Sequence, residues 1–179
     1  MLSIEVIEEF EEYFEKMVPV IEAINKDYYL PEEKAGEYLA GLVSMSENYH
    51  LPFASDLAVL KAQMYQYVPE IDGRDRSGGK YERKRKKQYL LNGLQQGKAY
   101  ADDYFAGTRQ LLQESSILLR KVAAVASAKG LSLEGCTEQL IEHMKQDEEL
   151  FAALTNAIGT VGYSNMKCLL QRAVADVTE

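Results

Sequence analysis

The sequence predicts an all-α protein, a helical bundle of about six to seven helices organised around one long helix that spans roughly residues 81–129. Two observations predict this fold class. Apolar side chains recur at steps of three and four residues along most of the chain, which is the spacing of one helix face. No stretch alternates apolar and polar residues as a half-buried strand does. Because 179 residues suffice for one core, we expect a single domain over residues 1–179.

The first of three helices predicted within residues 1–68 begins near Ser3, a suitable N-cap. Pro19 lacks a backbone N–H, and its ring clashes with the carbonyl four residues earlier, so we expect a kink or a break there. Several carboxylates lie on the other faces and make this helix acidic. Its apolar seam consists of Ile7, Phe10, Phe14, Met17, Ile21 and Ile24.

Prolines also place the next two helices. Pro31 suits the first position of a helix, and the glutamates that follow it favour the positive end of the helix dipole. This second helix ends before Pro52. The third helix is predicted over roughly residues 54–68, with Ser55 or Asp56 as its cap.

Residues 69–79 are rich in glycine and small polar residues and are predicted to form a loop. The long helix follows within residues 80–130, because one apolar register continues without a slip for five heptads. The seam consists of Leu90, Leu94, Gly97, Ala101, Tyr104, Thr108, Leu111, Ser115, Leu118, Val122 and Val125. A second line at period seven consists of Leu91, Lys98, Phe105, Leu112, Leu119 and Ala126.

Four glycines carry specific expectations for this long helix. Gly93 and Gly97 lie one turn apart and predict close packing against a neighbouring helix. Gly107 is a candidate break that would divide the segment in two. Gly130 suits the position just past the helix end.

The last part of the chain, residues 131–179, predicts three shorter helices. Ser164 is the expected cap of the last one. The three helices span roughly residues 133–145, 148–158 and 165–177.

The feature most informative about function is a basic segment, residues 74–87, with the sequence RDRSGGKYERKRKK. It holds eight of the chain's twenty lysines and arginines against two carboxylates, so its net charge is +6, while the other 165 residues sum to −14. The whole protein carries −8 and is acidic, which excludes a surface that is basic all over. We therefore expect a local contact with an anion.

The basic segment begins the long helix, where cations oppose the helix dipole. Projecting the apolar seam back from Leu90 leads to Lys87 and Arg83, and a buried unpaired charge is strongly destabilising. We therefore expect the first two turns to project beyond the bundle or to fray. Tyr81 and Tyr89 flank the cations and are candidates for stacking on a base or another ring.

These properties lead to a functional hypothesis. We expect a non-catalytic helical adaptor or complex subunit that binds nucleic acid, RNA or DNA without sequence specificity, or another polyanion. The competing interpretation is a solvated helix start that is neutralised by the acidic first helix of the same chain. The candidate binding residues are Arg74, Arg76, Lys80, Tyr81, Arg83, Lys84, Arg85, Lys86, Lys87 and Tyr89.

Three other interpretations stay open. A protein–protein interaction module, of an assembly, chaperone or immunity type, would bind an acidic protein or other subunits, and the long seam would allow a homo-oligomer. A small helix-turn-helix-type regulator would use residues 148–177, with a recognition helix that opens at Ser164 and offers Lys167 and Arg172 as cations. A membrane surface is the third, and the small residues of the seam disfavour it.

Catalytic chemistry is not indicated. The sequence contains no nucleophile motif and no complete phosphate-binding loop, so we expect no enzyme and no cofactor. Glu47 and His50 form a single ExxH, which is half of the motif pair of a di-metal bundle, so we expect no metal site. Cys136 and Cys168 suit reduced thiols, the amino terminus does not resemble a signal peptide, and no apolar run spans a bilayer, so we expect a cytoplasmic protein.

Overall fold

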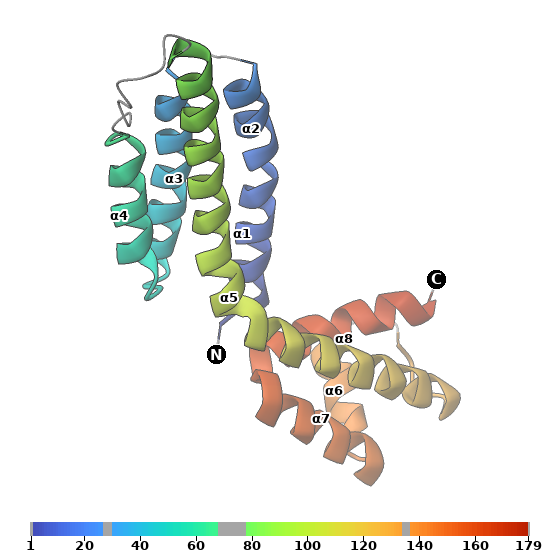
Figure 1. Ribbon diagram of the computed structural model, residues 1–179. Coiled ribbons are helices and arrows are strands. Elements are labelled where there is room, and N and C mark those ends of the chain that lie inside the picture. The colour runs from blue at the N-terminus through green and yellow to red at the C-terminus, as the bar shows by residue number, and fades with distance from the viewer. Residues whose placement is uncertain (1, 27–29, 68–77, 134–136, 179) are drawn as a thin grey trace. The chain divides into compact units, whose positions relative to one another are not determined.

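The computed structural model describes residues 2–26, 30–67, 78–133 and 137–178 (Figure 1). Within these ranges the chain forms α-helices and no strand, which confirms the all-α prediction. The helices are α1 (Ile4–Glu15), α2 (Met17–Asn25), α3 (Pro31–Asn48), α4 (Ala54–Met64), α5 (Gly78–Ala128), α6 (Thr137–Met144), α7 (Glu148–Val161) and α8 (Tyr163–Thr178). The long helix around residues 81–129 is α5, and it continues through Gly107.

The chain packs as two compact units. The first unit is Val6–Tyr104, and the second unit combines Met1–Glu5 with Phe105–Glu179. The chain therefore passes from one unit to the other inside α1 and again inside α5. The single domain expected over residues 1–179 stays a prediction, since each unit is described by itself.

The break expected in the first helix occurs at Lys16, between α1 and α2. The N–H of Lys16 bonds the carbonyl of Tyr13 at 3.1 Å, which is a tighter turn than an α-helix makes. Pro19 lies on the next turn and has no N–H to offer to the carbonyl of Glu15, where α1 ends. The proline thus divides the helix one turn upstream of its own position.

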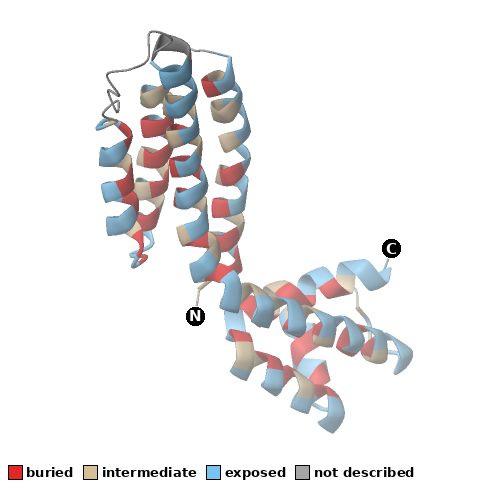
Figure 2. Cartoon of the chain, in the orientation of Figure 1, coloured by how far each residue is buried: buried red, intermediate tan, exposed pale blue. Residues whose placement is uncertain are grey.

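The core of the first unit consists of apolar stripes on α1 to α4 and on the first part of α5 (Figure 2). α3 begins at Pro31, as predicted. Phe10 lies at the centre, with edge-on ring contacts to Phe14 at 6.2 Å and to Phe53 at 6.1 Å. The buried side chains of this core include Phe10, Phe14, Ile24, Leu39, Leu42, Phe53, Leu57, Leu60, Met64, Leu90 and Leu94.

The predicted cap of α4 is wrong. The residue before the helix is Phe53, which makes no side-chain cap hydrogen bond, and Ser55 and Asp56 lie inside the first turn. A tight turn, in which the N–H of Ala54 bonds the carbonyl of Leu51 at 3.2 Å, begins the helix before either polar side chain is reached. α4 ends at Met64, and the predicted loop at residues 69–79 lies almost wholly outside the described residues.

Gly93 and Gly97 pack closely against neighbouring helices, as predicted. The terminal methyl of Met64 occupies the place where a Cβ on residue 93 would lie. A Cβ on residue 97 would lie 2.7 Å from a methyl carbon of Leu39 and 3.4 Å from one of Leu57. Here the missing side chains leave room for side chains of α3 and α4 rather than for another backbone.

The buried face of α5 changes along the helix, which corrects the predicted five-heptad seam. The seam is buried from Leu90 to Ala101, but Tyr104 and Leu111 are exposed. In the second unit the buried residues come from both lines, with Ser115 and Val122 of the seam beside Phe105, Leu119 and Ala126 of the other line. A straight helix has 3.6 residues per turn, so a pattern of period 3.5 drifts around it by about 20° per heptad.

In the second unit, α5 packs with α6, α7 and α8 around a shared apolar core. Gly130 ends α5 with a φ of 76°, as predicted, and the N–H of Leu131 bonds the carbonyl of Ala126 at 3.0 Å. The buried residues of this core include Ile4, Leu119, Val122, Leu140, Ile141, Met144, Leu150, Leu154, Val161, Met166 and Leu170.

Ser164 is not the cap of the last helix, because α8 already begins at Tyr163. Only Gly162 separates α7 from α8. Its φ of 80° is a conformation that side chains other than glycine rarely adopt, so one residue is enough to change the chain direction. Among the described helices, none is both long enough and apolar enough to cross a bilayer.

We predict that Gly97→Ala destabilises the first unit. Its new methyl would press on Leu39, and overpacking costs about 1–3 kcal/mol, against a gain in helix propensity of at most about 1 kcal/mol. Gly107→Ala is the matched control on the same helix, since apart from the adjoining backbone of α5 no described atom lies within 4 Å of its Cβ position, and it should stabilise by about 0.5–1 kcal/mol. Urea unfolding measures the free energy of unfolding of both variants. An equal change in the two variants would contradict the close packing of Gly97 against Leu39.

Candidate functional site: the basic segment

The described part of the basic segment is helical. α5 begins at Gly78, so the turns that carry Arg83 to Lys87 are neither frayed nor a loop. Arg74 and Arg76 lie outside the described residues, as does the side chain of Lys80. The candidate site therefore rests on Tyr81, Arg83 to Lys87 and Tyr89.

Two lysines of the segment are bound within the chain. The ammonium of Lys86 lies 2.9 Å from a carboxylate oxygen of Glu32, in the first turn of α3. Lys87 donates a hydrogen bond of 2.9 Å to the carbonyl of Asn25, the last residue of α2. A cation at the carbonyl end of a helix is favourable, since that end carries the negative pole of the dipole. The first two turns therefore do not project wholly beyond the bundle.

The Lys86 contact changes the acidity of its partner. Burial by itself raises the pKa of Glu32, but the hydrogen bond and charge of Lys86, together with a backbone hydrogen bond, outweigh it and hold this pKa below its ordinary value. The competing interpretation predicts that carboxylates of the acidic first helix neutralise the segment. The contacts described here are the Glu32 carboxylate in the first turn of α3, for Lys86, and a backbone carbonyl at the end of α2, for Lys87.

The two tyrosines that flank the cations have different surroundings. The hydroxyl of Tyr89 donates to the carbonyl of Gln63 at 2.9 Å, and its ring lies 5.3 Å from the ring of Tyr67. Tyr89 therefore fastens α5 to the end of α4. Tyr81 is 56% exposed, and the guanidinium of Arg85 lies 4.8 Å from the centre of its ring.

The remaining cations face solvent. Arg83 and Lys84 are exposed, and neither forms an ion pair with any residue that the structure describes. Lys84 and Arg85 lie three and four residues after Tyr81, so the three side chains share one side of the helix. Leu90 is buried on the opposite side, nine residues after Tyr81, or two and a half turns. The side that carries Tyr81, Lys84 and Arg85 is thus exposed, whereas Lys86, Lys87 and Leu90 contact the rest of the chain. Arg83 lies seven residues before Leu90 and therefore in its register, but it too is exposed.

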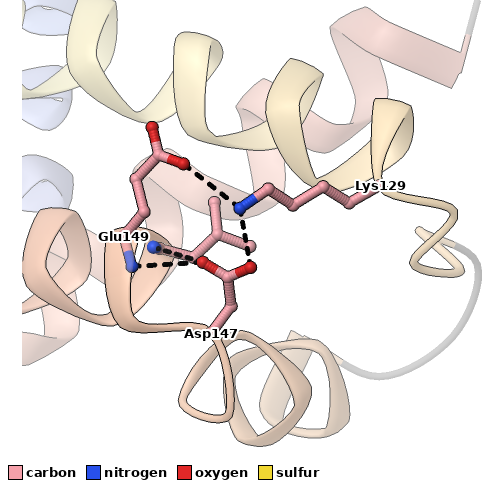
Figure 3. A network of polar contacts seen from close by, with 4 residues as sticks. Lys129, Asp147 and Glu149 are labelled. Atoms are coloured by element: carbon pink, nitrogen blue, oxygen red, sulfur yellow. Dashed lines mark hydrogen bonds and ion pairs between the residues drawn. The ribbon is translucent and has the colours of Figure 1, made fainter.

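A second polar network, which the sequence analysis missed, joins α5 to α7 in the second unit (Figure 3). Lys129 lies 2.6 Å from a carboxylate oxygen of Asp147 and 3.1 Å from one of Glu149. The other oxygen of Asp147 accepts the N–H groups of Glu149 and Leu150, both at 3.1 Å. This is an N-cap, and an aspartate directly before two glutamates was the sequence signal for it.

The charges in this network support one another. The hydrogen bonds of Asp147 and Glu149 raise the pKa of Lys129, and the Lys129 hydrogen bond lowers the pKa of Asp147. The contacts of Lys129, Asp147 and Glu149 hold the end of α5 against the start of α7, so we assign this network a structural role.

Asn165 is a second buried polar group that the sequence analysis missed. Its side-chain oxygen accepts the N–H of Ile4 at 3.0 Å, and its amide donates to the carbonyls of Leu2 and Val161, both at 2.9 Å. It holds the amino-terminal residues in the core of the second unit. No local pattern indicated this role, because its partners at the amino terminus are distant in sequence.

The structure of the carboxyl-terminal helix pair gives less support to DNA recognition than its sequence does. Its turn is the single residue Gly162, rather than the longer turn expected. Lys167 forms an ion pair with Glu138, and Asn165 and Met166, at the start of the candidate recognition helix, are buried. A recognition helix reads bases with exposed residues of its first turns, and here these residues serve the core.

The remaining candidate residues are His50, as a metal ligand, and the two cysteines. His50 follows the end of α3 with a φ of 53°. Within the described ranges, no three side chains of histidine, cysteine, aspartate or glutamate are grouped so that they could hold a metal ion. Cys168 has a half-buried free thiol, and Cys136 lies outside the described residues.

Comparison of the chain with protein-family models, with curated proteins and with solved structures finds no match.

We predict that Glu32→Gln lowers stability at pH 7 by about 0.5–1 kcal/mol, because it breaks the Lys86 ion pair. The pKa of Glu32 is lowered in the folded state, so its contribution is present above the unfolded pKa of about 4.3 and is lost as the pH falls through the folded value. The difference in stability between Glu32→Gln and the unaltered protein should therefore become smaller below about pH 4.

Glu33→Gln is the matched control, since Glu33 is exposed in the same first turn and meets the same helix dipole. Urea unfolding at pH 7 and at about pH 3 measures both variants. Identical stabilities of the two variants at pH 7 would show that the Lys86 contact contributes nothing.

Proposed function

We propose that this protein is a non-catalytic helical adaptor or complex subunit that binds nucleic acid, or another polyanion, through the basic segment. The observation that carries the proposal is the exposure of Arg83 and Lys84 without an ion pair among the described residues, directly before the two lysines that bind α5 to α3 and α2. A protein with a net charge of −8 has ample carboxylates to neutralise them. They are instead presented to solvent.

The exposed part of the basic segment has a high density of positive charge. Arg83, Lys84 and Arg85 are exposed and place three cations on less than one turn of helix, directly before Lys86 and Lys87. A phosphate backbone is a line of anions that such a group neutralises with release of counterions. Contacts of this kind position a nucleic acid and carry little sequence information.

The other partners considered for the chain stay predictions. An acidic protein would be attracted by the same charges, and self-association would use apolar rather than charged residues. A cytoplasmic location is likewise a prediction of the sequence. Nucleic acid is preferred because an exposed aromatic ring, Tyr81, lies beside the cations.

We predict that the double variant Arg83→Glu and Lys84→Glu loses most binding to a random single-stranded oligonucleotide at ~50 mM salt, where electrostatic binding is strong. Each phosphate contact contributes about 0.7 to the slope of log K against log salt for a single strand, so loss of both should reduce this slope by about 1.4. Fluorescence anisotropy at several salt concentrations gives both quantities. Lys86 and Lys87 are left unchanged because they hold the fold.

The matched control is the double variant Lys61→Glu and Lys121→Glu. It changes the net charge of the protein by the same amount at two lysines outside the segment, on α4 and on the second part of α5. If this control weakens binding as much as the first variant, the contact is a general charge effect. If the unaltered protein does not bind oligonucleotides at ~50 mM salt, the proposed function is wrong.

A further inference from the structure

Tyr81, Lys84 and Arg85 form one surface, which we call the Tyr81 face. Their spacing of three and four residues places them on the same side of α5. The ring of Tyr81 is 56% exposed, and the Arg85 guanidinium lies over it, 4.8 Å from its centre. A guanidinium thus lies over an aromatic ring at the surface, beside the exposed Lys84.

The chain holds this face toward solvent. On the other side of the helix, Lys86 contacts Glu32, Lys87 contacts the Asn25 carbonyl, and Leu90 is fully buried. These contacts come from α2, α3 and the core and fix the rotation of α5. A helix fixed in rotation presents the opposite side without a further loss of conformational freedom, which favours binding.

The chemistry of the Tyr81 face distinguishes single-stranded from duplex nucleic acid. In a duplex the faces of the bases are covered by their neighbours in the stack, and phosphates are what exposed cations reach. A single strand offers the faces of its bases, which stack on aromatic rings and on guanidinium planes. A ring, a guanidinium and an ammonium on one side suit a base together with the phosphate beside it.

We propose that the basic segment binds single-stranded nucleic acid in preference to duplex, with one base stacked on the Tyr81–Arg85 pair and a neighbouring phosphate on Lys84. This inference rests on the proposed function and names its ligand class. Tyr89, the other tyrosine of the segment, is not part of the contact, because its hydroxyl is bonded to Gln63 and its ring packs on Tyr67.

The test compares a single-stranded oligonucleotide of mixed sequence with a hairpin duplex of equal phosphate number, by fluorescence anisotropy at ~50 mM salt. Tyr81→Ala should weaken single-strand binding about tenfold and leave duplex binding and the salt slope unchanged, because stacking carries no charge. Tyr81→Phe keeps the ring and should bind as the unaltered protein does. Tyr163→Ala, at an exposed tyrosine of the second unit, is the control.

Each outcome decides the inference. Since Tyr81 is exposed, its variants should retain their helical content, which circular dichroism checks. Equal single-strand affinity of Tyr81→Ala and the unaltered protein, with binding still lost in the Arg83 and Lys84 double variant, would overturn the stacking contact and leave the proposed function standing. If Tyr81→Ala bound both the single strand and the duplex tenfold more weakly, the proposed preference for single-stranded nucleic acid would be wrong. Absence of binding to either probe would overturn both proposals.

Discussion

The structure depends on one constraint, which is that α5 changes from a run of cations to an apolar face within a single turn. Leu90 is fully buried, and Lys86 and Lys87 lie just before it on the same helix. Charges so close to a core must find partners, because an unpaired buried charge is strongly destabilising. They find them at the ends of the two neighbouring helices, in the Glu32 carboxylate and the Asn25 carbonyl. These contacts mark where the core of the first unit stops.

The same constraint gives the two sides of the basic segment different surroundings. Lys86 and Lys87 contact α3 and α2, whereas Lys84, on the other side of the helix, is exposed, and we propose that it contacts a binding partner. The tyrosines divide in the same way, since Tyr89 is bonded to the end of α4 and Tyr81 remains at the surface. A run of residues that looks uniform in the sequence therefore has one side that contacts the rest of the chain and one exposed side, to which we assign the proposed binding.

Much of the fold follows from local rules. The spacing of apolar residues predicts most of the helices, and Pro19, Pro31 and Gly130 predict where three of them break, begin or end. The rest depends on partners that are distant in the chain. Nothing near Lys86 indicates that Glu32 neutralises it, and nothing near Asn165 indicates that it holds the amino terminus. Of the candidate site, the sequence predicts the location and the residue types but not which side of the helix is exposed.

The most direct test of the two-sided segment follows its lysines one by one. In protein with isotopically labelled lysine, the Cε–Hε resonances report on each ammonium during NMR titration with a single-stranded oligonucleotide at ~50 mM salt. The account predicts that the Lys84 resonance shifts on binding, while those of Lys86 and Lys87 stay in place because their ammonium groups remain on Glu32 and Asn25. Shifts of Lys86 and Lys87 as large as that of Lys84 would contradict it.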